Sequence, residues 1–100
     1  MIKTPTVPTI TTTAQVIYTE DKSGASRPGT WLFRNTGSET VYVGGGYVDQ
    51  AGNETIEVTT SNGFPVEANE VLSLDLIAGE SVYALTQSGT STGRLLRTNG

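Results

Sequence analysis

The segment Val71–Ile77 constrains this chain most, because its apolar side chains alternate with polar ones. Leu72, Leu74 and Leu76 fall on one face of an extended segment, whereas a serine and an aspartate fall on the other. This period of two is typical of a β-strand with one buried face. A short A-G-E-S sequence follows, and Val82–Thr86 again has strand character. Because the glycine suits a tight turn, the two segments are predicted to pair as a hairpin.

The rest of the chain has the pattern of short strands separated by polar and glycine-rich turns. No segment has apolar residues at i, i+3, i+4 and i+7 over the length of a helix. The triple glycine at 44–46 is expected to mark a bulge, a sharp bend or the close approach of another backbone. Further strands are predicted at Ala14–Glu20, Thr30–Asn35, Thr40–Val43, Glu54–Thr59 and Arg94–Arg97.

These patterns predict an all-β fold, a compact antiparallel β-sandwich or jelly-roll-like barrel of about seven or eight short strands. Residues 1–13 are expected to form an extended arm rich in threonine and proline, and residues 14–100 the β-sandwich domain. One hundred residues are enough for a single modest core. The core is predicted to contain Val16, Tyr18 or Ile17, Trp31, Phe33, Val41, Val43, Ile56, Val58, Leu72, Leu74, Leu76, Val82 or Tyr83, Leu85 and Leu95.

The charge balance argues against several classes of partner. Ten acidic and six basic residues give a net charge of −4, and the cations are scattered along the chain. A nucleic-acid binder usually needs a concentrated positive face. No apolar run approaches the roughly 18 residues of a membrane span. The N-terminus lacks the plan of a signal peptide, so we expect synthesis in the cytoplasm with neither nucleic acid nor membrane as partner.

Catalytic chemistry is equally poorly supported. The chain has no histidine and no cysteine, which removes Ser-His-Asp arrangements and thiolate sites. Glu20 and Asp21 are adjacent in sequence and would point to opposite sides of a strand. The segment Asp49–Glu54 has oxygen ligands spaced like a fragment of a calcium loop but lacks the full pattern, so a plain turn is preferred. We therefore expect no enzyme, no cofactor and no metal site.

Five aromatic residues offer one alternative to a purely structural role. Trp31, Tyr18, Tyr42, Tyr47 and Tyr83 would suit a sugar-stacking platform if they shared an exposed face. Aromatic residues at strand positions are more often buried or half-buried in a core, and that interpretation is preferred here.

The N-terminal arm, Met1–Thr13, is the main candidate for a partner contact. Its two prolines fix the backbone and cannot donate hydrogen bonds, so it is not expected to be a central strand. Its few apolar side chains bury too little surface to order it alone, so contact with another chain is expected to do so. The predicted partner-binding residues are Ile2, Thr4, Pro5, Val7, Pro8 and Ile10. Crossed arms would favour a homo-oligomer, with a trimer preferred.

A resemblance to known proteins rests on several short motifs. They are L-F-R-N-T-G-S-E-T-V-Y-V-G-G at 32–45, N-G-F-P-V at 62–66, E-V-L-S-L-D-L-I-A-G-E-S-V-Y-A-L at 70–85, and the final R-L-L-R. In these motifs the region Trp31–Thr98 resembles small all-β proteins of tailed-phage particles. The stretch Asp49–Val58 looks like an extra hairpin against the shorter pattern, and the arm is not part of it.

The resemblance implies a capsid decoration or cement protein that binds the major capsid protein on the outside of the head shell. The expected location is then the capsid surface of the virion. The alternative is a receptor- or glycan-binding β module of a phage fibre or tail, and a third hypothesis is a free bacterial β domain unrelated to virions.

Overall fold

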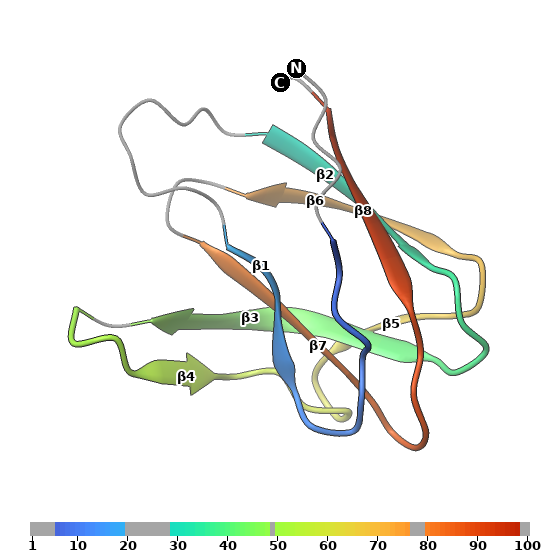
Figure 1. Ribbon diagram of the computed structural model, residues 1–100, viewed down its shortest axis with the longest axis horizontal. Helices are drawn as coiled ribbons and strands as arrows, with labels where there is room; N and C mark the ends of the chain where they lie inside the picture. Colours follow the sequence, from blue (N-terminus) through green and yellow to red (C-terminus); the bar gives the residue numbers. More distant parts are fainter. Residues whose placement is uncertain (1–5, 20–28, 49, 77–79, 99–100) are drawn as a thin grey trace.

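The computed structural model describes residues 6–19, 29–48, 50–76 and 80–98, and every regular element within these ranges is a β-strand. The strands are β1 (Gln15–Thr19), β2 (Gly29–Asn35), β3 (Val41–Val48), β4 (Glu54–Ile56), β5 (Phe64–Val66), β6 (Val71–Leu76), β7 (Ser81–Thr86) and β8 (Gly93–Thr98). All pairings are antiparallel. One sheet has the order β1-β7-β3-β4 with β5 also on β3, and the other has the order β6-β2-β8. Figure 1 shows the two sheets stacked as layers, which confirms the predicted all-β fold.

β2 is the central strand of the smaller sheet, and its alternation sets which face of that sheet is buried. Trp31 and Phe33 are fully buried, whereas Arg34 is exposed on the other face. Phe33 lies opposite Leu72 of β6 and Leu95 of β8. The apolar positions of all three strands therefore face the larger sheet, as the period of two predicts.

The predicted hairpin between β6 and β7 is wrong, because the two strands lie in different sheets. β6 pairs with β2, whereas β7 pairs with β1 on one side and with β3 on the other. All six residues of β7 are buried, since apolar clusters cover both of its faces. Residues 77–79, where the predicted strand ends and the predicted turn begins, lie outside the described residues. The connection from β6 to β7 therefore links the two layers and does not close a hairpin.

β3 passes through the triple glycine without a break, so the strand predicted at Thr40–Val43 continues to Val48. A Cβ placed on Gly44 would lie 2.6 Å from Cγ2 of Val58, and one on Gly46 would lie 2.5 Å from Cε1 of Tyr83. The backbone oxygen of Thr55 would also be 2.6 Å from the Cβ on Gly46. Close approach of neighbouring atoms is thus the reason for glycine at these two positions.

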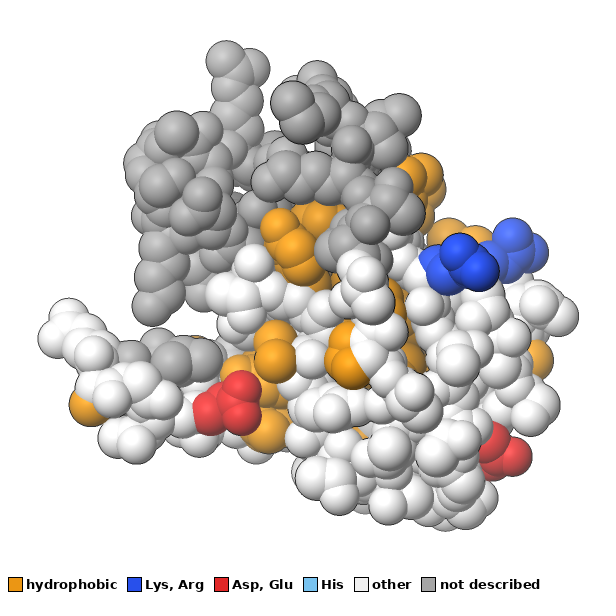
Figure 2. Space-filling view, in the orientation of Figure 1, with side chains coloured by type: hydrophobic (Ala, Val, Ile, Leu, Met, Phe, Trp, Pro, Cys, Tyr) orange, Lys and Arg blue, Asp and Glu red, His pale blue; other side chains and the backbone are white. Residues whose placement is uncertain are grey.

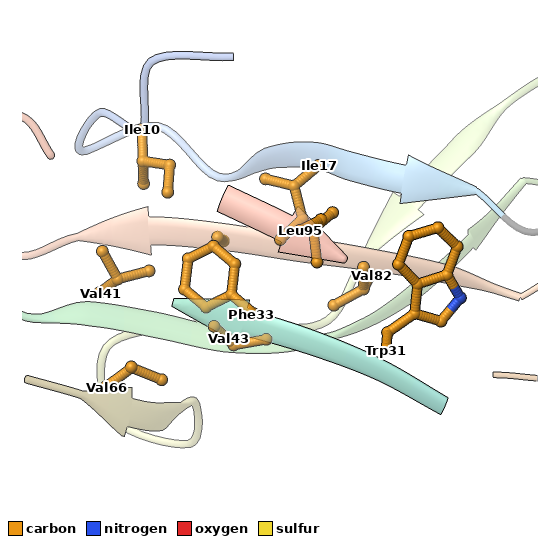
Figure 3. Packing of buried hydrophobic residues seen from close by; sticks show 10 residues of the cluster. Ile10, Ile17, Trp31, Phe33, Val41, Val43, Val66, Val82 and Leu95 are labelled. Carbon is orange, nitrogen blue, oxygen red and sulfur yellow. The ribbon is translucent and has the colours of Figure 1, made fainter. Parts of the chain in front are cut away.

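The core consists of two clusters, one between the sheets and one on the outer side of β7. The main cluster contains Ile10, Ile17, Trp31, Phe33, Val41, Val43, Val66, Val82, Ala84 and Leu95, whose side chains meet between the layers (Figure 3). The second contains Val58, Tyr83 and Leu85, with Ala14, Val16 and Tyr42 packed against it. Burial of apolar surface in both clusters is the principal stabilising contribution.

Most predicted core positions are buried or half-buried, and the differences have structural causes. Ile56 was expected inside but is 37% exposed, because β4 is a three-residue edge strand that ends at this residue. Of the pair Ile17 and Tyr18, Ile17 is buried and Tyr18 is half-buried. The side chain of Leu76 lies outside the described residues. Ile10 and Val66 are core residues that the alternation did not identify.

Candidate interaction surface

The N-terminal segment contains the predicted partner-binding residues, and the structure places some of them. Ile2, Thr4 and Pro5 lie outside the described residues. Pro8 is exposed, and Val7 is half-buried against the main cluster. Ile10 is 0% exposed and belongs to that cluster. Its burial removes Ile10 from the partner-binding residues, because a fully buried side chain offers no surface to another chain.

Backbone hydrogen bonds hold this part of the segment on its own domain. Ile10 N donates to Ser91 O and Ser91 N donates to Ile10 O, each over 2.9 Å. Thr86 N donates to Thr11 O over 2.8 Å. Residues 10 and 11, which precede β1 in the sequence, are therefore bonded to the last residue of β7 and to Ser91 in the segment that follows β7.

The polar side chains of the described residues can be compared with the requirements of a metal site. No three His, Cys, Asp or Glu side chains in these ranges gather into a group that could hold a metal ion. The Tyr83 hydroxyl donates to Oε2 of Glu54 over 3.2 Å. Burial raises the pKa of Tyr83, and Glu54 raises it further, so the phenol stays protonated at neutral pH. Within the described ranges no helix has the length and apolarity needed to cross a membrane.

Asn35 is a fully buried polar side chain with all its hydrogen-bonding positions filled. Its Nδ2 donates to Glu39 O over 2.7 Å and to Val66 O over 2.8 Å. Its Oδ1 accepts from Gly37 N at 3.0 Å and from Ser91 Oγ at 2.7 Å. A fully satisfied amide has no capacity left for a ligand, so this group ties the turns together.

An apolar groove opens between the sheets where β6 faces β3. Its volume is about 280 Å³. Leu72 and Leu74 of β6 line one wall, and Val43 and Gly45 of β3 line the other. Nothing lies within 4 Å of a Cβ placed on Gly45, so the missing side chain leaves this part of the interior open. Phe64, 59% exposed, stands at the rim.

β6 borders this groove and is also an edge of its sheet. Among the described strands it pairs only with β2, so its other side has no strand beside it. An unpaired strand edge presents backbone N–H and C=O groups to which another chain can add. The sequence signals at this site are the triple glycine and Phe64-Pro65, both of which the pattern assigns to bends and turns.

The five aromatic residues considered for a sugar platform do not share an exposed face. Trp31 and Tyr83 are fully buried. Tyr18 stacks on Trp31 with ring centroids 4.2 Å apart, and Tyr42 packs against the second cluster. Tyr47 is 52% exposed, so it alone of the five presents most of its ring to solvent.

Comparisons of this chain with protein-family models, with curated proteins and with solved structures find no match. Function therefore has to be inferred from the sequence motifs and from the groove beside β6.

Proposed function

We propose that this chain is a structural, non-enzymatic protein of a tailed-phage particle. On this proposal it decorates or cements the outside of the head shell by binding the major capsid protein. Two observations support it. The first is the resemblance carried by the V-Y-V-G-G, G-F-P and L-S-L-D-L-I-A-G-E motifs. The second, which carries the binding mode, is the apolar groove beside the open edge of β6.

The groove and the strand edge together suit an extended segment of the capsid protein. A strand added to β6 would satisfy backbone groups on both chains. Every second side chain of that strand would point toward Leu72, Leu74 and Gly45, into space that is already open. Phe64 at the rim would then be covered, and burial of its ring would add to the binding free energy.

Repetition over the shell would convert modest single contacts into stable attachment. Each copy would bury only one short strand and a few side chains, so its own affinity for the shell would be modest. A contact between neighbouring copies of this chain would raise the overall affinity, because the linked copies would have to dissociate together. A homo-oligomer is accordingly part of the proposal, with a trimer preferred. Sedimentation of the purified chain measures the oligomeric state directly.

The test is reconstitution of purified particles that lack this protein. Gly45→Leu places a side chain in the groove and should abolish binding while the domain stays folded. Ser61→Leu is the matched control, because it adds the same side chain to an exposed turn and should bind like wild type. Undiminished binding by Gly45→Leu would refute the groove as the attachment site. Mass spectrometry of native particles should find many copies of the chain, and a few copies per particle would contradict a coat role.

The second candidate is a receptor- or glycan-binding module at a fibre or tail, and the exposed rings favour it. Tyr47 and Phe64 are 52% and 59% exposed, and an exposed ring is what stacking on a sugar requires. Glycan-array binding that is lost in Tyr47→Ala would support this candidate over the coat protein. Absence of array binding together with a high copy number would reject it.

A further inference from the structure

The outer face of the smaller sheet combines two cations with exposed apolar side chains. Antiparallel register aligns the outward positions of β6, β2 and β8 in rows across the strands. The first row is Val71, Arg34 and Arg94; the second is Ser73, Leu32 and Leu96; the third begins with Asp75 and Thr30. This face lies on the opposite side of the sheet from the main core, so the apolar side chains on it are not part of that core.

Arg34 and Arg94 are direct cross-strand neighbours, which the scattered cations of the sequence do not reveal. Like charges opposite each other on adjacent strands destabilise a sheet. Among the described residues neither guanidinium has a hydrogen bond or an ion pair that would offset this repulsion. The carboxylate of Asp75 lies in the row at the other end of the face, where its Oδ1 accepts from Thr30 Oγ1 over 3.0 Å. Folding alone therefore does not explain the pair.

Apolar side chains adjoin the two arginines. Val71 is 55% exposed and lies opposite Arg34. Leu96 is 36% exposed and lies opposite the half-buried Leu32 in the next row. Figure 2 shows Lys or Arg side chains near hydrophobic ones at the upper right of the view. Arginine next to apolar surface is the composition typical of a protein interface.

We infer that this face binds a protein surface that presents two neighbouring carboxylates beside aliphatic side chains. The planar guanidinium matches a carboxylate through two parallel hydrogen bonds, and two arginines on adjacent strands match a pair of carboxylates. The leucines and valine then need an aliphatic counterpart, which a phosphate backbone lacks. A chain of net charge −4 with two cations on the face is also a poor match for a polyanion of phosphates. This face is separate from the groove, so the inference does not depend on the capsid proposal.

The test uses the full chain, labelled with ¹⁵N, and a synthetic peptide in which glutamate pairs alternate with leucines. Amide shifts should change along β2 and β8, and not at Val43, Gly45 and Phe64, which line the side of the groove away from this sheet. The double variant Arg34→Gln/Arg94→Gln should bind the peptide about tenfold more weakly or worse, and added salt should weaken binding to the wild type. Asn62→Ala, which changes an exposed turn before β5 of the other sheet, should leave the affinity unchanged. The double variant should melt no lower than wild type, because it loses a like-charge pair.

Three further measurements separate this partner from other occupants. A peptide with glutamine in place of glutamate should not bind, and equal binding would overturn the role of the carboxylates. Polyphosphate that binds as tightly as the acidic peptide would overturn the assignment to a protein surface. Sedimentation should show the same oligomeric state for wild type and the double variant. Self-association lost in the double variant would overturn an external partner, because a second copy would then occupy the face.

Discussion

The hydrogen bonds of Asn35 make Asn35→Ala the most informative single change for the fold. Truncation removes two donors and an acceptor from a position that is 0% exposed. Two of the orphaned partners, Val66 O and Ser91 Oγ, are in buried hydrogen bonds, and the other two, Glu39 O and Gly37 N, are in partly buried ones. Water can reach the partly buried pair more readily, so the main loss arises at the buried pair.

The expected loss of stability follows from those two groups. Leaving a buried donor or acceptor unsatisfied costs about 1–3 kcal/mol. Val66 O and Ser91 Oγ together therefore imply a loss of about 2–6 kcal/mol, against a total of about 5–15 kcal/mol for a domain of this kind. A loss of that size would leave the variant close to its unfolding midpoint in buffer if the wild type lies at the lower end of the range.

Urea unfolding monitored by the fluorescence of Trp31, the single tryptophan, measures this loss directly. The matched control is Asn62→Ala, because Asn62 also bonds backbone groups through its amide, accepting from Thr59 N at 2.7 Å and donating to Glu57 O at 3.0 Å, but in exposed positions. The control should lose about 1 kcal/mol or less, since water replaces those partners. Equal losses in the two variants would refute the argument that burial of the Asn35 network sets the cost.

Three other predictions use the same unfolding measurement. Ile10→Ala should lose about 2–5 kcal/mol because its side chain is buried in the main cluster, and a variant as stable as wild type would show that the N-terminal segment is not docked. Gly44→Ala should lose about 1–3 kcal/mol through its contact with Val58, whereas Gly45→Ala should change stability by no more than about 0.5–1 kcal/mol. Because burial and Glu54 raise the pKa of Tyr83, the unfolded chain releases this proton at lower pH than the folded one. Stability should therefore fall as the pH rises above the ordinary value of 10.0, and flat stability through that range, with tyrosinate absorbance followed in parallel, would contradict it.

The local pattern was sufficient for most of the strands and for their faces, but it assigned Phe64-Pro65 of β5 to a turn. Leu72 and Leu74 point inward and Ser73 points outward, as alternation requires, because side-chain direction in a strand depends only on the backbone of that strand. The same reasoning failed for Ile56, which lies on a strand too short and too peripheral to be covered. Composition alone likewise excludes sites that need a histidine or a cysteine, because the chain has neither.

Partner choice between strands depended on the tertiary structure. The pattern does not tell which strand lies beside β6, because loop-closure entropy changes slowly with loop length and a near neighbour in sequence has only a small advantage. In the structure β6 pairs with β2, and among the described strands the other edge of β6, beside the groove, is unpaired. Both candidate surfaces share this origin. The groove forms where Gly45 of β3 faces β6, and the cation pair forms where β8 places Arg94 opposite Arg34 of β2. Each site joins segments that are far apart in the sequence, so the alternation within a single strand does not predict it.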